Sequence, residues 1–459
     1  MIRPRPRPRP ILGLLALFAL AACTPPGKGM IALEGATLID GSGGPPVTDA
    51  LILIRGGRIE AVSRVNEIHV PRGAQIINLI GKTVIPGLID AHARAERWAM
   101  PRFVAWGVTT LRDAGDAPED TLIALRNDLS LGTILGPRMY SPGSGIDGAP
   151  AGFAGWVAAA TPEEARKAVD ARVNAGVDYV MAEPGVSPTM LRSILDEATV
   201  LHTVVALTPG RVDAASAARA GVTALDQLTG VVSAMARNPA SFMKAYGRRW
   251  AGWAAEEKGW STFDSNAVAS MARTLAGGHV SLIPTLVSHD AMARLDDPSL
   301  LEGSGWSDVP ASRASVRGIA EFLRETGWSA RDLSAFVSAR TRQNQFVRDF
   351  RLAGGLVAAG SDAPSPGLAP GGSLHREMAL LVQAGFSPLE AITAATRYGA
   401  QLLQADSLGV VQQGRLADLV VLNSDPSQHI ESTQDIAWVM LRGNIYHPDS
   451  LRLQWSHEH

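Results

Sequence analysis

Short apolar runs that alternate with helical patterns along the middle of the chain are the feature that most constrains its fold. Two intervening helices have clear starts, because Thr161 and Ser387 are each followed by proline and, three residues on, by glutamate. Strands that alternate with helices build βα units around a parallel sheet, so the sequence predicts an α/β protein. Eight runs are predicted as strands: residues 83–89, 108–111, 138–141, 178–181, 203–207, 224–227, 281–286 and 356–359.

Both ends of the chain carry a different pattern, in which β-rich runs alternate with turn signals. Residues 36–39, 51–54 and 59–62 are such runs near the beginning, and residues 417–422 and 436–440 are their counterparts near the end. Neither set has enough strands to enclose a core alone. We therefore expect the two ends to pair into one small β-domain.

The composition excludes several function classes. The chain has 459 residues and a formal net charge of -2, with both signs of charge spread along its length. Because no basic block is present, we predict no nucleic-acid partner and no polybasic membrane surface. The hydrophobic content of 46% is enough for a large core, and a single α/β barrel can use a chain of this length.

The first residues predict export. Four arginines alternate with prolines in residues 3–10, and residues 11–20 form an apolar run that is too short to span a bilayer. Cys23, the only cysteine, follows two alanines, and this segment resembles the bacterial lipobox. We predict a signal peptide over residues 1–22, a lipid on Cys23 as the only membrane anchor, and a location on the periplasmic face of the outer membrane. The alternative is an ordinary secretory signal with an incidental cysteine.

A long insert, residues 229–280, separates the sixth and seventh predicted strands. It contains Trp250, Trp253 and Trp260. Packing in the core is the expected role of these side chains, and lining the mouth of a barrel is the alternative. The sequence predicts no oligomeric state.

The run over residues 81–94, Gly-Lys-Thr-Val-Ile-Pro-Gly-Leu-Ile-Asp-Ala-His-Ala-Arg, resembles the first barrel strand of the amidohydrolase superfamily. The resemblance is closest to the imidazolonepropionase and Xaa-Pro dipeptidase-like group. It covers nearly all of the mature chain, with further matches at residues 107–113, 136–138, 284–286, 373–377 and 414–422.

This resemblance implies a (β/α)8 TIM-like barrel with a small β-sandwich domain built from both termini. The implied boundaries place the signal peptide at residues 1–22, the two sandwich parts at 23–82 and 406–459, and the barrel at 83–405. The activity implied is hydrolysis of non-peptide or dipeptide C–N bonds. In such barrels the catalytic residues lie at the carboxyl ends of the strands.

The resemblance also implies a binuclear metal site, of which this chain keeps two ligand positions. His92 matches a metal ligand, and Asp362 matches the residue that serves as both metal ligand and general base. The remaining ligand positions are occupied by residues of other types: Arg94, Met181, Leu207 and Gln227.

These replacements predict that no metal is tightly bound. A guanidinium has no lone pair to offer a cation, and a catalytic zinc takes at least three protein ligands. With Asp362 left as a candidate general base, we expect little or no catalysis of the family type and predict a protein that binds a small molecule or peptide. We also expect Arg94 to contact Asp362 in place of the missing metal charge.

Two alternatives remain open. In the first, the chain is an active hydrolase with one zinc or similar ion held by His92, Glu183 and Asp362. Glu183 lies two residues beyond Met181, so the period of a strand gives it the same face, although a solvated loop position is the simpler expectation for it. In the second, the chain is a structural or interaction protein at a membrane surface.

Overall fold

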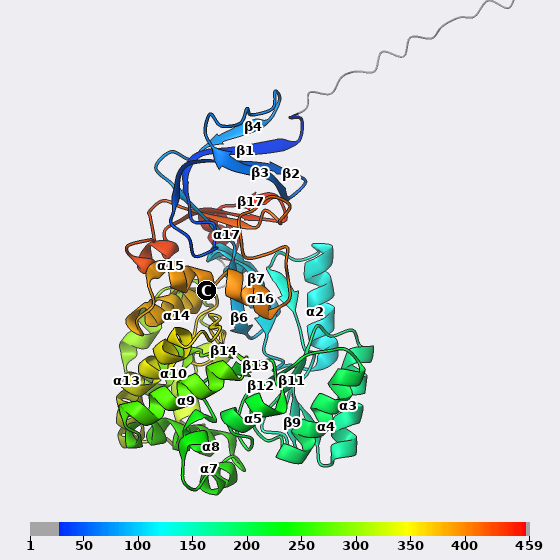
Figure 1. Cartoon of the computed structure of the whole chain (residues 1–459), viewed down its shortest axis with the longest axis vertical. Helices are drawn as coiled ribbons and strands as arrows, with labels where there is room; N and C mark the ends of the chain where they lie inside the picture. Colours follow the sequence, from blue (N-terminus) through cyan, green and yellow to red (C-terminus); the bar gives the residue numbers. More distant parts are fainter. Residues whose placement is uncertain (1–26, 456–459) are drawn as a thin grey trace, which may run out of the picture.

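Strands from both ends of the chain form one eight-stranded sheet in the computed structural model, which describes residues 27–455 (Figure 1). Its order is β17-β16-β15-β5-β1-β2-β3, with β4 beside β1. The predicted pairing of the two ends is therefore present; the predicted signal peptide and Cys23 lie outside the described residues. The strands are β1 (Met30–Leu38), β2 (Val47–Arg55), β3 (Arg58–Arg64), β4 (Gln75–Asn78), β5 (Thr83–Pro86), β15 (Leu419–Leu422), β16 (Ile436–Leu441) and β17 (Asn444–Tyr446).

The predicted strand over residues 83–89 is wrong as one unit. β5 belongs to the terminal sheet, where it pairs with β1 and β15, whereas β6 (Leu88–Ala93) belongs to a parallel sheet. The chain passes between the sheets at Gly87, where a Cβ would lie 2.1 Å from Thr109 Oγ1. Only glycine fits such a close approach, so the break comes from a contact distant in sequence.

The parallel strands form two sheets. One has the order β10-β9-β11-β12-β13-β14, and the other has the order β6-β7-β8. Backbone hydrogen bonds link the two sheets. The Asp178 amide, just before β11, donates to the Ser141 carbonyl, just after β8, and the Ala91 amide of β6 donates to the Ala359 carbonyl in the segment beside β14, both at 2.9 Å. The remaining strands are β7 (Val108–Asp113), β8 (Arg138–Tyr140), β9 (Ile146–Gly148), β10 (Val157–Ala159), β11 (Val180–Ala182), β12 (Val205–Leu207), β13 (Ala224–Asp226) and β14 (Ser281–Ile283).

The predicted set of eight strands needs two corrections. β9 and β10 were not predicted, and residues 356–359 form a single bridge from Val357 to Leu282 instead of a strand. The backbone of this segment bonds to three different neighbours. Ala358 donates to Leu282, Ala359 donates to Ala394, and Ala359 accepts from Ala91. A ladder with one partner strand therefore does not form, but the segment still lies between β14 and β6.

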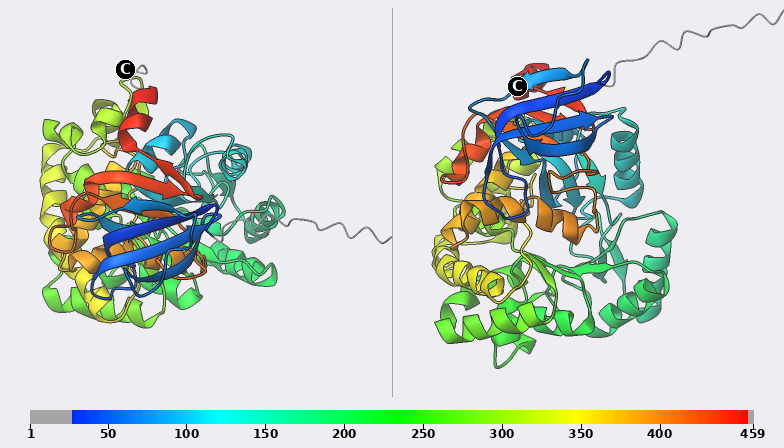
Figure 2. Two further views of the ribbon diagram at one scale, coloured as in Figure 1. Left: turned by 90° about the horizontal axis from the view of Figure 1, so that it is seen from above. Right: turned by 45° about the horizontal axis from the view of Figure 1, so that its top comes forward.

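Helices surround the parallel strands, and the terminal sheet covers one end of the assembly (Figures 1 and 2). The predicted helix starts are confirmed, because Thr161 caps α3 and Ser387 forms a capping box on α15. Within residues 27–455, no helix is long and apolar enough to span a membrane. The helices near the site are α8 (Arg249–Gly259), α10 (Leu286–Ala293), α12 (Ile319–Thr326) and α13 (Ala330–Leu352).

The other helices complete the layer outside the strands or join it to the terminal sheet. They are α1 (Met100–Ala105), α2 (Glu119–Leu131), α3 (Pro162–Asn174), α4 (Pro188–Val200), α5 (Ala214–Ala220), α6 (Val231–Met235), α7 (Ala240–Ala245), α9 (Ser265–Gly277), α11 (Ala314–Arg317), α14 (Gly372–Gln383), α15 (Pro388–Ala394), α16 (Arg397–Leu402) and α17 (Pro448–Trp455).

The parallel strands separate two apolar regions. A large cluster fills the space between strands and helices, and a smaller cluster on the inner side of the strands contains Ala91, Met181, Ala206 and Ile283. Because alternate residues of a strand face opposite sides, the smaller cluster identifies the inward-facing positions. Two residues beyond Met181 and Ala206, the polar side chains of Glu183 and Thr208 lie at the carboxyl end of the strands.

Candidate functional site

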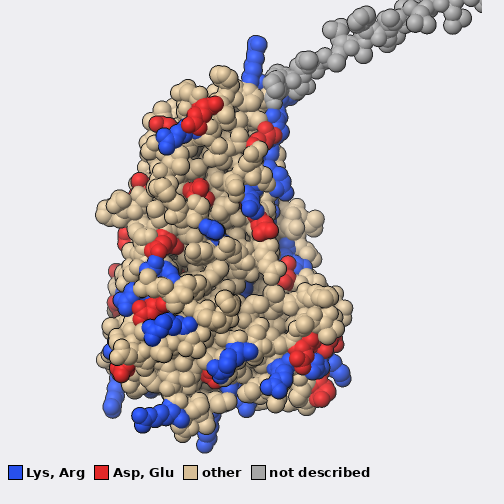
Figure 3. Space-filling view, viewed as in Figure 1, with Lys and Arg blue, Asp and Glu red and all other residues tan. Residues whose placement is uncertain are grey.

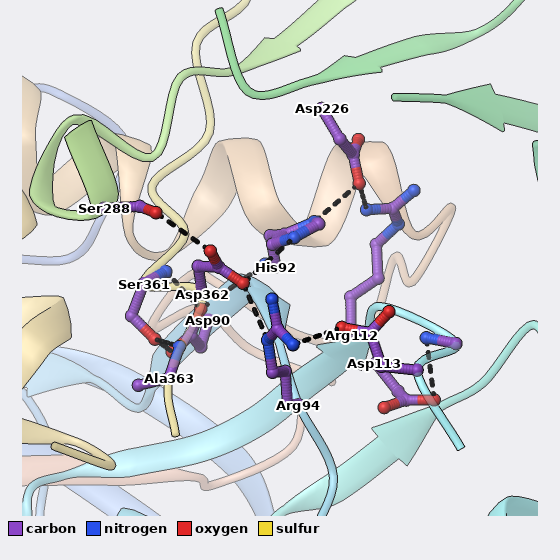
Figure 4. A network of polar contacts seen from close by, with 12 residues as sticks. Asp90, His92, Arg94, Arg112, Asp113, Asp226, Ser288, Ser361, Asp362 and Ala363 are labelled. Atoms are coloured by element: carbon purple, nitrogen blue, oxygen red, sulfur yellow. Dashed lines mark hydrogen bonds and ion pairs between the residues drawn. The ribbon is translucent and has the colours of Figure 1, made fainter. Parts of the chain in front are cut away.

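A network of charged side chains lies at the carboxyl ends of the parallel strands (Figure 4). His92 comes from β6, Arg112 from β7 and Asp226 from β13, and Arg94 and Asp362 follow the ends of their strand segments. The Asp362 amide donates to the His92 carbonyl at 2.7 Å, so the two segments are adjacent. This is the end at which α/β barrels place their sites.

Arg94 joins two carboxylates. Its Nε donates to Asp362 Oδ1 at 2.9 Å, and its terminal nitrogen lies 2.9 Å from Asp116 Oδ2. The Ser288 hydroxyl, from α10, donates to the other oxygen of Asp362 at 2.9 Å. The contact that the sequence predicts between Arg94 and Asp362 is therefore present.

These contacts keep Asp362 ionised. Burial alone would raise its pKa, but the positive charge of Arg94, that of His92 and the hydrogen bonds from Arg94 and Ser288 bring the pKa below its ordinary value. Both carboxylate oxygens already accept a hydrogen bond. Asp362 is therefore a weak base in this geometry, and both of its oxygens are already hydrogen-bonded.

A second charged group lies deeper between the strands. His92 Nδ1 and the Arg112 guanidinium both contact Asp226 Oδ2 at 2.7 Å, and Arg112 also donates to the Ala91 carbonyl at 3.0 Å. The guanidinium lies 4.3 Å from the centre of the Tyr179 ring. Burial would raise the pKa of Asp226, but Arg112 and His92 outweigh it and lower the pKa.

The other predicted positions are distributed over both sides of the strands. Met181 packs in the inner apolar cluster, and Leu207 packs among the helices on the outer side. The residue after it, Thr208, lines the cavity instead, as does Gln227. The expectation of a solvated loop position for Glu183 is wrong. Its side chain is buried, and its negative charge raises the pKa of Arg94 together with Asp116 and Asp362.

A cavity of about 350 Å³ opens beside Arg94 and Asp362. Trp250 and Trp253 of α8 form part of its wall and also pack in an aromatic cluster with Trp328, so these two residues combine the two roles considered from the sequence. Trp260 is fully buried and does not line the cavity.

The chain leaves three neighbouring strand ends through left-handed backbone. The φ angles are 66° at Gln227, 44° at Thr285 and 57° at Asp362. Residues other than glycine adopt this conformation at a cost of about 1–3 kcal/mol each, and such positions concentrate at functional sites. The surrounding structure therefore holds this end of the strands in a costly arrangement.

Sequence reasoning missed four residues of the network: Arg112, Asp116, Asp226 and Ser288. Arg112 lies within a motif that was assigned only to the fold, and Asp226 immediately precedes Gln227. Both were available as polar residues at strand ends. Asp116 and Ser288 lie beyond strand ends, where only the folded loops bring them to Arg94 and Asp362.

The described part of the chain contains no group of three or more histidine, cysteine, aspartate or glutamate side chains placed to hold a metal ion. His92 Nε2 lies 3.7 Å from Asp362 Oδ1, and the Arg94 guanidinium lies against that same oxygen. The site is thus built from ion pairs within the protein.

Comparisons with known proteins relate this arrangement to amidohydrolases. Residues 312–446 match the Amidohydrolase family. A segment of 91 residues is 36% identical to an N-acyl-D-aspartate deacylase of Alcaligenes xylosoxydans xylosoxydans; it covers 19% of this chain and 18% of the deacylase. The chain therefore spans about a fifth of the length of the curated relative it matches.

Solved structures extend the similarity to nearly the whole chain. A structure assigned as a prolidase, from Bifidobacterium longum, is 25% identical with a TM-score of 0.68 and covers 94% of this chain and 100% of its own. A bottromycin amidohydrolase is 20% identical with a TM-score of 0.71, covering 93% of this chain and 89% of its own. The protein thus has a mixed α/β fold of the amidohydrolase type and resembles hydrolases of C–N bonds.

Proposed function

We propose that this protein binds a small molecule or peptide in the cavity beside Arg94 and does not carry out the metal-dependent hydrolysis typical of amidohydrolases. The observation that supports this most strongly is the position of Arg94, whose guanidinium contacts Asp362 and Asp116 at 2.9 Å each. A fixed cation therefore stands beside the carboxylate that matches a metal ligand in the family.

The residues present do not fit the family's metal. His92 Nε2 and Asp362 Oδ1 could act as two ligands, but a catalytic zinc takes at least three from the protein. Arg94 already donates to that oxygen of Asp362, and a second cation at the same point would face its positive charge at short range. Glu183 is buried near the same cation, because its negative charge contributes to raising the pKa of Arg94 against the effect of burial.

Loss of the metal removes most of the chemistry. Without it, the pKa of water stays near about 16 instead of about 7. A general base alone supplies about 10²–10⁴-fold acceleration, whereas enzymes typically reach at least about 10⁶-fold. Asp362 is a poor base besides, since its pKa is lowered and both oxygens accept hydrogen bonds.

Binding is supported by features that a vestigial site would not need. The cavity of about 350 Å³ falls in the range of small-molecule pockets, about 300–1,000 Å³. Three strand ends around it keep left-handed backbone. A purely structural role at a membrane surface would leave this arrangement without a purpose.

Metal content tests the proposal. The purified chain, loaded with excess zinc and desalted, is expected to hold well under one metal per chain, and Arg94→His, which restores the second histidine of the motif, should hold more. One or more zinc ions per wild-type chain would contradict the proposal. If Glu183→Gln then abolished that zinc, the mononuclear site of His92, Glu183 and Asp362 would be the better explanation. Zinc-dependent hydrolysis of an N-acyl amino acid or an Xaa-Pro dipeptide by the purified chain would also contradict it.

We also propose that the protein is lipid-anchored at the periplasmic face of the outer membrane. The support is the sequence around Cys23, with threonine at position 24. Cys23→Ser should prevent labelling by a fatty-acid probe and leave unprocessed precursor, while a serine substitution of Thr24 should leave labelling intact. Unchanged labelling of the Cys23 variant would contradict the anchor.

A further inference from the structure

The charges that line the cavity are strongly unbalanced. Five lining residues carry carboxyl groups, and one carries a guanidinium; no lysine or histidine is among them. The carboxyl groups belong to Glu96, Asp113, Asp116, Glu325 and Asp362, and the guanidinium belongs to Arg94.

Arg94 neutralises only part of this excess. Its two contacts go to Asp362 and Asp116, and Glu96 accepts a hydrogen bond from the neutral Trp98 indole at 2.6 Å. Glu325, on α12, is exposed and makes no hydrogen bond or ion pair with any residue of the described chain. The cavity therefore keeps a net negative charge with a free carboxylate at its wall.

Aromatic rings form the apolar part of the same wall. Trp250 packs edge-on against Phe322 with centroids 4.9 Å apart, and both residues line the cavity. Trp253 lines it too and is held by stacking on Trp328 at 5.0 Å. The cluster fixes these rings before any ligand arrives, and the electron-rich face of a tryptophan attracts cations.

Two hydroxyl groups belong to the polar part of the cavity wall. Thr229 and Ser365 line it with only 2% and 4% of their surfaces exposed, and neither hydroxyl has a hydrogen-bond partner within residues 27–455. A buried polar group without a partner is costly. A ligand with a donor or acceptor of its own would satisfy them.

We propose that the cavity binds a small organic cation, a protonated amine carried on an apolar or aromatic body. The ammonium group is attracted by the carboxylates and the tryptophan faces, the body packs on the aromatic wall, and the buried hydroxyls accept or donate the remaining hydrogen bonds. This inference rests on the proposed binding function and specifies the ligand class.

Three probes that share one body and differ in charge test it: phenylpropylammonium, phenylpropanol and phenylpropanoate. Each is titrated into the full mature chain at neutral pH, with tryptophan fluorescence excited where the phenyl group does not absorb and with calorimetry as a second readout. The cation is expected to bind about tenfold more tightly than the alcohol, and the carboxylate is expected to bind more weakly than the alcohol.

Substitutions test whether the preference for the cationic probe arises at the cavity. Glu325→Gln should weaken the cation about threefold or more and leave the alcohol unchanged. Glu321→Gln is the matched control, because Glu321 lies one turn earlier on α12, is exposed and does not line the cavity; it should change neither affinity. Trp250→Leu should weaken both the cation and the alcohol, the cation more.

The outcomes separate the two proposals. If the alcohol or the carboxylate binds as tightly as the cation, the inference of a cationic ligand is overturned, while the binding function stands. If Glu325→Gln and Glu321→Gln weaken the cation equally, the preference is a general surface effect, and the inference is again overturned. If none of the three probes binds at millimolar concentration, the inference of a cationic ligand is overturned, while the binding function is judged by the metal measurement on the wild-type chain.

Discussion

Two arginines that begin from neighbouring strands occupy opposite environments. The Arg112 side chain is 3% exposed and shares one oxygen of Asp226 with His92, whereas the Arg94 side chain is 17% exposed and lines the cavity with Asp362 and Asp116 beside it. The contacts are similar in length and chemistry. The difference shows that the same kind of ion pair is sealed between the strands in one layer and forms part of a cavity wall in the next.

The comparison also concerns what each pair contributes to stability. Burying two charges costs desolvation that their attraction only partly offsets, so a buried pair is weak evidence for net stabilisation. Removing one partner is different, because the other charge then stays buried alone. The cost should be largest where water cannot enter.

The largest effect is expected for Arg112→Ala. Asp226 has no exposed surface, so this change should lower the free energy of unfolding by about 3–5 kcal/mol, measured by chemical denaturation at neutral pH. His92 still contacts Asp226, so the double variant with Asp226→Asn should recover part of the loss. A cost below about 1 kcal/mol would mean that the inner layer admits water, and the distinction between the two arginines would disappear.

A smaller effect is expected for Arg94→Ala, because water from the cavity can reach Asp362. The expected loss is about 1–3 kcal/mol. Asp362→Asn in the same chain should recover part of it, and the two changes should couple by about 0.5–3 kcal/mol, as contacting residues do. Strict additivity in this double-mutant cycle would show that the contact contributes nothing and would remove the argument that Arg94 replaces the metal charge.

The smallest effect is expected in the pH dependence of the free energy of unfolding, which depends on how far water is excluded from the cavity wall at Asp113. Burial raises the pKa of Asp113 to about 7, against the hydrogen bond from the Ala95 amide and with help from the nearby Asp116 charge. The folded state then holds a proton that the unfolded state, with a pKa near about 3.9, has released. The part of the free energy of unfolding that Asp113 contributes is therefore greatest below about pH 4 and is lost as the pH rises from there through about 7.

Asp113→Asn should remove about 1 kcal/mol of the stability difference between about pH 6 and pH 7, measured by denaturation at each pH. Glu256→Gln is a matched control away from the cavity, since burial raises the pKa of Glu256 to about 7 as well. If Asp113→Asn leaves the pH dependence unchanged while Glu256→Gln reduces it, the cavity wall is wet at Asp113.

The sequence was informative where a motif and a strand end coincide. His92, Arg94 and Asp362 lie at adjoining strand ends as predicted, because the backbone of residues 361–363 bonds directly to the end of β6 and the residue that follows it. The resemblance to amidohydrolases supplied these positions, and the opposite charges of Arg94 and Asp362 then predicted their contact.

The site residues that the sequence did not reveal depend on which way each side chain faces. Leu207 and Thr208 are adjacent, yet one packs on helices and the other lines the cavity, and a shift of one residue reverses such an assignment. Asp116 reaches Arg94 only through the loop after β7. The division of residues 83–89 at Gly87 came from a contact with Thr109, which no local pattern contains.

The terminal sheet has a consequence for how the chain is made. β5 lies between β1 and β15, so one of its edges waits for a partner that the ribosome adds only after every parallel strand. An exposed strand edge is a template for association with other chains, and pairings between distant segments form slowly. The segment that holds the parallel strands therefore lies between two ends of the chain that can pair only after the whole chain has been made, and until then the free edge of β5 is open to association with other chains.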